Sequence, residues 1–284
     1  MKKTINIADY KSNDEIKSIV ADIGNLPLKE GSHGYLDVGP IRIIDAAISS
    51  TNNYSTRSKT RPAISVIDVV LAANRNYNKV VAPNVKRIEK TDLNSIDDLK
   101  VMLSSKPIEE FYEFWGHKDL KKYNTLNSII DAVDVIKEMY PNQKTEYDYI
   151  NQWAINVDIN NFKSDPIGKI SNIGVATIQH LRMAFGAETI KPDQRVKEVL
   201  EYEFGLEKMN DIKIINVMEQ IAKIVNLSVL AIDQVFVKYG SGYYNRTSNK
   251  LNIKEIAKRL KNLGVSIDII SQATDLSKTQ INKV

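Results

Sequence analysis

Residues 171–196, SNIGVATIQHLRMAFGAETIKPDQRV, combine a tight turn with the starts of two helices. Asn172 and Gly174 tolerate a left-handed backbone, so a hairpin is expected there. The segment 176–185 follows with helical spacing and precedes a glycine that can end the helix. Proline is favoured in a first helical turn, so a second helix is expected at 192–204. Asp193 lies in that turn, where the helix dipole stabilises an anion.

Apolar residues recur with helical spacing along most of the chain, and alternating strand-like segments are scarce. In the stretch 12–24, Ile16, Val20 and Ile23 share one face behind Ser12, a typical N-cap residue. Further helices are expected at 40–49, 62–73, 95–103, 108–115, 126–139, 147–155, 212–225 and 229–239. The pattern therefore predicts an all-α protein.

Polar, turn-rich passages interrupt this pattern. The stretch 49–61, SSTNNYSTRSKTR, has no apolar periodicity and predicts a loop, and 238–250, KYGSGYYNRTSNK, has the composition of a linker. A basic tail of two or three short helices is expected over 246–284. Its eight Lys/Arg and three Asp/Glu give it a net charge of +5, whereas the whole chain carries +4. Its spacing is similar to a helix-turn-helix; a solvated surface, a structural cap and a nucleic-acid contact are the alternatives.

Composition excludes several classes of site. The chain has no cysteine, which rules out disulfides, thiolate zinc sites and cysteine-ligated iron–sulfur clusters. His33, His117 and His180 lie far apart in sequence without metal-site spacing, so no catalytic metal is expected. No run of about 18 apolar residues predicts a membrane span. The N-terminus lacks the apolar segment of a secretory signal, so a cytoplasmic monomer is expected.

The hairpin at 170–176, followed by Pro192-Asp193, resembles the helix-hairpin-helix–GPD superfamily of DNA glycosylases. That family has an apolar-x-Gly-apolar-Gly hairpin and then a loop containing Pro and Asp; here Asn172 stands for the first glycine. The resemblance covers about 40–240. It implies two helical domains flanking a DNA-binding cleft, one formed by 1–61 plus 190–245 and the other by 62–189, which ends in the hairpin.

The resemblance also implies roles for particular residues on double-stranded DNA. Asp193 would act at the anomeric carbon of the sugar. The hairpin would hold a DNA phosphate through Asn172, Ile173, Gly174, Ala176 and Thr177, and further backbone contacts are expected from Arg57, Arg61, Lys191 and Arg195. Thr51 stands where the family has a glutamine that wedges into the duplex. Thr51, Asn52, Asn53 and Tyr54 are therefore candidates for filling the gap in the duplex or for lining the base pocket. Trp153 is a candidate for stacking on the flipped base.

Ala176 occupies the position where bifunctional members of the family carry their Schiff-base lysine. Without that amine, the expected reaction is hydrolysis by water, with no lyase activity and an abasic site as product. The target base must first be flipped into a pocket. A carboxylate can then stabilise the oxocarbenium-like sugar and orient the water. No cofactor is expected; a monovalent cation at the hairpin is the one bound ion that the resemblance allows.

The substrate and the reaction itself leave alternatives open. An alkylated, oxidised or deaminated base would indicate base excision repair, whereas a bulky modified base, such as glucosylated cytosine in phage DNA, would indicate antiviral defence. A non-catalytic helix-hairpin-helix DNA-binding protein would keep the hairpin and not need the chemistry of Asp193. A helical interaction protein would show no affinity for DNA.

Overall fold

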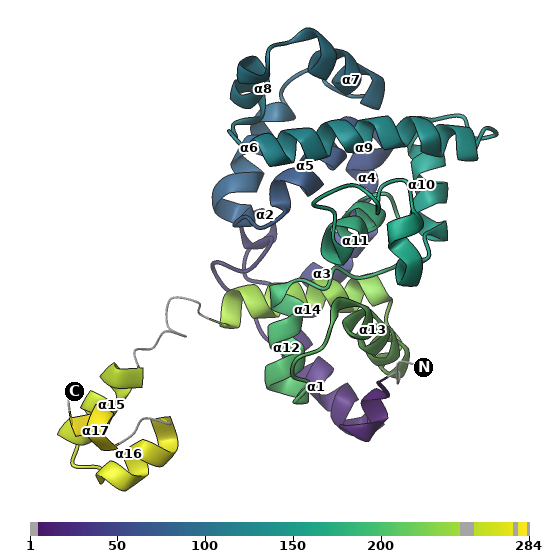
Figure 1. Cartoon of the computed structure of the whole chain (residues 1–284). Helices are drawn as coiled ribbons and strands as arrows, with labels where there is room; N and C mark the ends of the chain where they lie inside the picture. The colour runs from purple at the N-terminus through teal and green to yellow at the C-terminus, as the bar shows by residue number, and fades with distance from the viewer. Residues whose placement is uncertain (1–4, 245–252, 275–277, 283–284) are drawn as a thin grey trace.

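The structure, a computed structural model, describes residues 5–244, 253–274 and 278–282. Within these ranges the chain is helical and contains no β-strand, which confirms the all-α prediction (Figure 1). The elements are η1 (Ile7–Asp9), α1 (Asn13–Asn25), α2 (Tyr35–Val38), α3 (Ile43–Asn53), α4 (Thr56–Thr60), α5 (Pro62–Ala72), η2 (Tyr77–Val81), α6 (Ala82–Ile88), α7 (Ile96–Ser105), α8 (Ile108–Trp115), α9 (Leu120–Met139), α10 (Glu146–Asn156), η3 (Ile159–Ser164), α11 (Val175–Ala184), α12 (Gln194–Phe204), α13 (Asp211–Val225), α14 (Val229–Tyr243), α15 (Ile253–Asn262), α16 (Ile267–Thr274) and α17 (Lys278–Asn282).

One hydrophobic core, the upper core, is built by α5 to α11 in the upper part of Figure 1. Helix α5 runs through it and is buried over its whole length, because its sequence PAISVIDVVLA is apolar on every face. The large side chains of Phe111, Trp115, Trp153 and Phe185 fill the space around it. Burying each of these aromatics contributes about 1.5–3 kcal/mol.

A second core, the lower core, is built by the N-terminal and the later helices α1, α3, α12, α13 and α14 (Figure 1). Helix α3 packs along α14, and α12 packs on the same helix. Buried residues pass from the lower to the upper core between Ala47 and Ala63, and back between Ala187 and Ile190. Segments far apart in the sequence therefore share the lower core.

Helices α15, α16 and α17 pack on one another around Ala257, Ile270 and Ile281. The described part of the tail thus forms short helices, as its sequence pattern predicts. The linker segment 245–252 lies outside the described residues.

The prediction of a loop at 49–61 is wrong. Helix α3 continues to Asn53 and α4 follows. Helix α3 packs along α14, and this tertiary contact outweighs the weak helix propensity of its polar end. The side chains there bond within the helix: Thr51 donates to the carbonyl of Ala47 at 2.9 Å, and Asn53 to that of Ser49 at 3.1 Å.

The expected linker at 238–250 begins too early, because α14 continues to Tyr243. Its late glycines are explained by close packing. A Cβ at Gly240 would lie 3.2 Å from the carbonyl oxygen of Arg195, and one at Gly242 would lie 2.0 Å from the hydroxyl of Ser32. Glycine is needed there by the neighbouring segments, not by a turn.

In the described ranges, no single helix combines the length and apolarity needed to cross a bilayer; α13 and α14 satisfy that test only as a pair bent by 104°.

Candidate functional site

The turn that leads into α11 is held closed by Asp165. Its Oδ1 accepts the backbone N–H groups of Ile167 at 2.8 Å and Gly168 at 3.0 Å, and its Oδ2 accepts the indole N–H of Trp153 at 2.8 Å. Both carboxylate oxygens therefore have partners. The carboxylate ties the turn to α10 and fixes where the next residues emerge.

At the tip of this turn, Asn172 has a φ of 69°, which confirms the left-handed backbone expected from the sequence. The Ile173 N–H donates to the carbonyl of Ile170 at 3.2 Å, and Gly174 begins α11 without a side-chain cap. Within the described residues, the N–H groups of Gly174, Val175 and Ala176 have no acceptor. A helix start with free N–H groups favours an anion.

Asp193 is the N-cap of α12 and is half-buried. Its Oδ1 accepts the N–H groups of Arg195 at 2.8 Å and Val196 at 3.2 Å. Its Oδ2 has no hydrogen-bond partner in the part of the chain that the structure describes. The cap fixes the orientation of the carboxylate and leaves one oxygen free to act on a ligand.

A second carboxylate, that of Asp233 on α14, lies near Asp193 and is 1% exposed. It accepts the backbone N–H of Lys191 at 3.0 Å and the side-chain amide of Gln234 at 3.1 Å. Burial, reinforced by the negative charge of Asp193, raises the pKa of Asp233 to about 7. These bonds position the segment on which Asp193 lies, so Asp233 is a positioning residue.

Two histidines distant in the sequence come together near Lys191. The side-chain amine of Lys191 lies 3.5 Å from Nδ1 of His180 on α11. Burial and the nearby charges of Lys238 and Lys191 lower the pKa of His33 to about 4. Burial, with the charge of Lys191 and the imidazole of His33, also holds the pKa of His180 well below its usual range. Both imidazoles are therefore neutral at pH 7.

His33 and Lys238 connect the lower core to the upper one. Lys238 on α14 is 1% exposed, and its amine donates to the carbonyl of His33 at 3.3 Å. The His33 N–H donates to the Ser241 hydroxyl at 2.8 Å. Its ring meets that of Tyr77 edge-on, with centroids 5.1 Å apart. A buried lysine next to a neutral imidazole is an expensive arrangement, which makes this junction unlike an ordinary apolar core contact.

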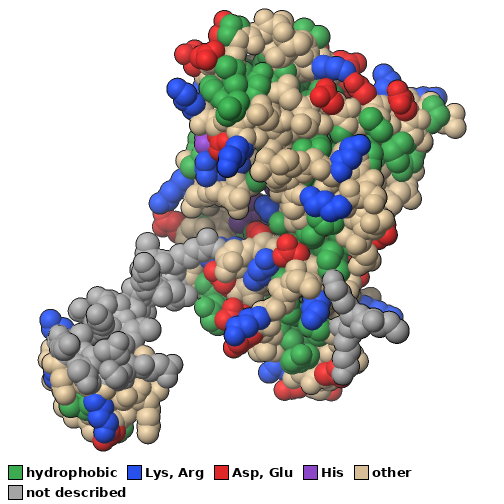
Figure 2. Space-filling model, viewed as in Figure 1, with side chains coloured by type: hydrophobic (Ala, Val, Ile, Leu, Met, Phe, Trp, Pro, Cys, Tyr) green, Lys and Arg blue, Asp and Glu red, His purple; other side chains and the backbone are tan. Residues whose placement is uncertain are grey.

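Tyr54 follows α3 and lies where charged groups of both cores act on it. Burial raises the pKa of its phenol well above the usual value, and the carboxylates of Asp233 and Asp68 act in the same direction. Asp68 belongs to α5 in the upper core, and Asp233 to α14 in the lower one. The set Tyr54, His33, His180, Lys191, Asp193 and Asp233 is called the polar junction below. The space-filling view is hollowed where the upper and lower parts of the molecule meet (Figure 2).

Three of the arginines expected on DNA are engaged inside the protein. Arg57 donates to Asp68 and to Glu89. Arg61 donates to the carbonyls of Glu89, Thr91 and Leu93, which close the end of α6. Arg195 donates to Glu198 at 3.1 Å, one turn further along α12. All three nitrogens of Arg57 and of Arg61 are bonded in this way, so we assign these two residues to holding the fold. Only Nη1 of Arg195 is bonded, so its contact to DNA stays a prediction.

The residues expected to fill the duplex or the base pocket lie in three different environments. Thr51, Asn52 and Asn53 form the last turn of α3, with the two asparagines exposed. Tyr54 lies within the polar junction. Trp153 is 1% exposed and bonded to Asp165, so it cannot stack on a flipped base, and that expectation is withdrawn.

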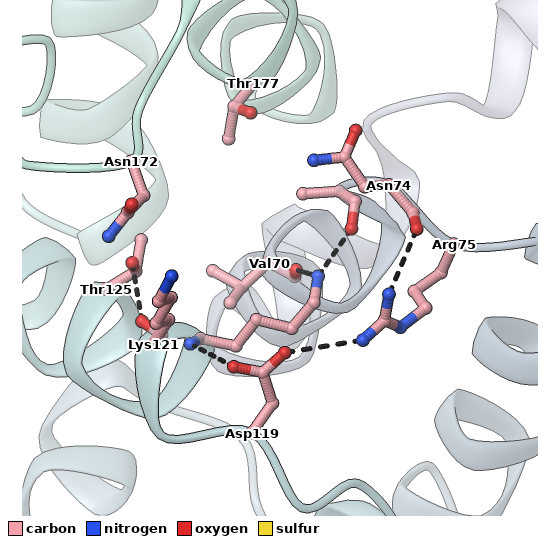
Figure 3. Close-up of a pocket in the computed structure, with 10 residues that line it drawn as sticks. Val70, Asn74, Arg75, Asp119, Lys121, Thr125, Asn172 and Thr177 are labelled. Atoms are coloured by element: carbon pink, nitrogen blue, oxygen red, sulfur yellow. Dashed lines mark hydrogen bonds and ion pairs between the residues drawn. The ribbon is translucent and has the colours of Figure 1, made fainter.

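A basic pocket of about 180 Å³ lies beside the hairpin, between the end of α5, the start of α9 and the start of α11 (Figure 3). Lys122 donates to the carbonyls of Val70, Leu71 and Ala73 there, and burial lowers its pKa to about 8. The remaining lining includes Arg75, Asp119, Lys121, Asn172 and Thr177. Within the described chain, the side chains of Lys121, Asn172 and Thr177 have no hydrogen-bond partner. The pocket therefore offers free polar groups and a positive balance to an anion.

The sequence does contain a signal for one residue of the polar junction, Asp233, and for two buried charged residues near it. Asp68 is the one charge in the apolar run PAISVIDVVLA, and Asp233 and Lys238 interrupt the apolar run VLAIDQVFVKY. Charged residues inside such helices are buried and must be paired. His33 and His180 offer no such signal, because only the packing brings them together. No cluster of metal-ligating residues occurs among the described residues.

Comparisons of this chain with protein-family models, with curated proteins and with solved structures find no match. The site is therefore interpreted from its own residues.

Proposed function

We propose that this protein is a monofunctional DNA glycosylase that flips a damaged or modified base from duplex DNA and hydrolyses its N-glycosidic bond. The upper and lower cores would be the two domains, with 62–189 on one side and 1–61 plus 190–245 on the other. The observation that carries the proposal is Asp193: its Oδ1 is fixed by the α12 cap, its Oδ2 has no described partner, and its charge acts on the buried phenol of Tyr54.

Asp193 would stabilise the reacting sugar. Breaking the N-glycosidic bond develops positive charge on the deoxyribose, and an ionised carboxylate beside it lowers that barrier. The free Oδ2 can also orient a water for attack at the anomeric carbon. Water is the proposed acceptor because Ala176 supplies no amine, so the product is an abasic site.

The neutral groups of the junction suit a pocket for a flipped base. His33 and His180 each carry one N–H donor and one acceptor when neutral, and Tyr54 keeps its proton well above neutral pH. Such groups can bond to the edge of a base without attracting a free phosphate into the pocket. We propose His180 as a pocket residue in addition to Tyr54, which the sequence already predicts there.

The hairpin and the basic pocket would hold the DNA backbone. The free N–H groups at 174–176 point to one phosphate, and the unpartnered side chains of Lys121, Asn172 and Thr177 offer contacts to the same strand. Ile173 is 3% exposed and both of its backbone groups are bonded within the turn, so it would shape the hairpin without contacting DNA itself. Lys191 would remain near the sugar, between the hairpin helix and Asp193.

The decisive experiment is detection of released bases. The protein is incubated with genomic DNAs that carry alkylated, oxidised, deaminated or glucosylated bases, and the supernatant is analysed by mass spectrometry. Base release that the Asp193→Asn variant loses supports the proposal and separates a repair substrate from a phage-modified one. No release from any of these DNAs by the wild-type protein, under conditions where it binds duplex, would refute it.

A second candidate is a non-catalytic DNA-binding protein, which the N-cap geometry favours. Asp193 has a complete structural explanation in its bonds to Arg195 and Val196. On this alternative, Asp193→Asn binds DNA like the wild type and neither protein releases a base. The salt dependence of duplex binding distinguishes both readings from a protein without DNA affinity, for which no binding is expected.

A further inference from the structure

Two backbone carbonyls of the hairpin turn converge on one lysine. The amine of Lys163, on η3, donates to the carbonyl oxygen of Gly168 at 3.0 Å and to that of Ile173 at 2.8 Å. The same amine lies 4.8 Å from the centre of the Phe162 ring. Lys163 is exposed, so these contacts hold a positive charge at the surface of the turn, while the turn's free N–H groups lie at the start of α11.

Carbonyl oxygens that point to one centre are the ligands that Na⁺ and K⁺ use in proteins, where they replace the hydration shell of the ion. The resemblance to helix-hairpin-helix proteins leads one to expect such an ion at this hairpin. The residues present do not fit a free ion bound by these carbonyls, because the ammonium of Lys163 already holds both. An ammonium carries the same unit charge and directs its own N–H groups to the oxygens.

We propose that Lys163 is the built-in cation of the hairpin: its tethered ammonium replaces the free monovalent ion that would otherwise organise the Gly168 and Ile173 carbonyls. The turn is packed closely enough to need such a link. A Cβ at Gly168 would lie 1.9 Å from the carbonyl oxygen of Phe162, so the chain segments at Phe162 and Gly168 are in direct contact. Asp165 holds the neighbouring N–H groups, and Lys163 holds the carbonyls.

The consequence is that the hairpin is indifferent to the identity of the salt cation. A free-ion site selects among cations by size and hydration, whereas a covalently tethered ammonium is present at every ionic composition. Folding stability and DNA binding should therefore be the same in K⁺, Na⁺ and tetramethylammonium salts at one ionic strength. The expectation for folding stability does not depend on the proposed function.

The test compares the wild type with Lys163→Met, which keeps the apolar stem and removes the charge, and with Lys169→Met as the matched control. Lys169 belongs to the same turn, is exposed and has no described partner for its amine. Thermal melting without DNA and anisotropy titration with a duplex are measured in each of the three salts at constant ionic strength.

We expect wild type and Lys169→Met to melt at the same temperature in all three salts. Lys163→Met should bind duplex about tenfold more weakly in tetramethylammonium, on the scale set by loss of a charge-assisted hydrogen-bonding group, and K⁺ or Na⁺ should restore part of the loss. A wild-type melting temperature or affinity that depends on the cation would overturn the proposal, even if the variant failed to fold. So would a folded Lys163→Met whose DNA affinity equals that of the wild type in every salt. Base release is not measured, so the proposed enzymatic activity and this inference fail independently.

Discussion

Asp165, in the turn that leads into α11, and Asp193, the N-cap of α12, bind the backbone that follows them in the same way, yet only Asp193 keeps an oxygen without a partner in the described chain. Each accepts two backbone N–H groups through Oδ1. At Asp165 the second oxygen accepts the indole N–H of Trp153. At Asp193 the second oxygen has no partner in the described chain.

The same pair of backbone hydrogen bonds can therefore serve packing at one aspartate and, on the proposed function, chemistry at the other. The Asp165 turn is saturated and stabilises the fold, and the nearby Lys163 completes it. Asp193 caps α12 with one oxygen and keeps the other without a described partner; on the proposed function, this would preorganise the carboxylate for electrostatic catalysis.

The largest effect is expected from Asp193→Asn. Asparagine caps a helix about as well as aspartate, so the fold and duplex binding should persist. Loss of the anionic Oδ2 should lower single-turnover base release by about 10²–10³-fold, as removal of one preorganised electrostatic group does in enzymes. The measurement is release of a radiolabelled base at saturating enzyme. Asp165→Asn is the control, and in its folded state it should retain activity; equal loss in the two variants would remove the distinction between the turns.

The second prediction concerns pH, because Asp233 supports the Asp193 segment. The pKa of Asp233 is raised to about 7, so the folded state keeps its proton while the unfolded chain loses it from about pH 4 upward. Stability is therefore lost as pH rises between about 4 and 7. The lowered pKa of His33, about 4, acts in the opposite sense and adds stability from about pH 4 to 6.5.

Replacing Asp233 isolates the first of these effects. In Asp233→Asn the acid contribution is gone, so its stability relative to wild type should rise with pH by up to about 1.4 kcal/mol per unit between pH 4 and 7 and then level off. Denaturant unfolding at a series of pH values measures this. Parallel stability curves for the two proteins would show that Asp233 is not titrating as described.

A smaller loss is expected at the saturated turn. In Asp165→Asn the amide oxygen can still accept the two backbone N–H groups, but the amide nitrogen then faces the Trp153 N–H, donor against donor. Leaving that buried indole unpaired should cost about 1–3 kcal/mol in the free energy of unfolding. The midpoint of urea unfolding, read with tryptophan fluorescence, checks it; Asp193→Asn, with no partner on Oδ2, should shift the midpoint far less.

The smallest effect is expected at the tip of the same turn. Asn172 has a φ of 69°, where alanine is strained by about 1–2 kcal/mol and glycine is not. Asn172→Ala should therefore destabilise the protein, and Asn172→Gly should leave stability within about 1 kcal/mol of the wild type. Urea unfolding of the pair decides the matter. Equal stability of the two variants would argue against a left-handed residue at this position.

The elements around this site were predictable to different degrees. Ile16, Val20 and Ile23 fall on the buried face of α1, and Ser12 caps it with a complete capping box, because periodicity and caps are local properties. The stretch 49–61 was not predictable, since its polar side chains satisfy themselves inside α3 in a way that composition does not reveal. Trp153 was misassigned because burial depends on what packs against a helix.

By itself, the sequence determined the helical class, the left-handed residue at Asn172 and the aspartate at the start of α12. Each of these is settled within a few neighbouring residues by backbone sterics and capping. Only the tertiary structure decided that Asp193 faces Tyr54 and Asp233, that His33 approaches His180, and that Lys163 holds the hairpin carbonyls. Those contacts join separate helices, and their positions follow from how two hydrophobic cores pack, which no local pattern encodes.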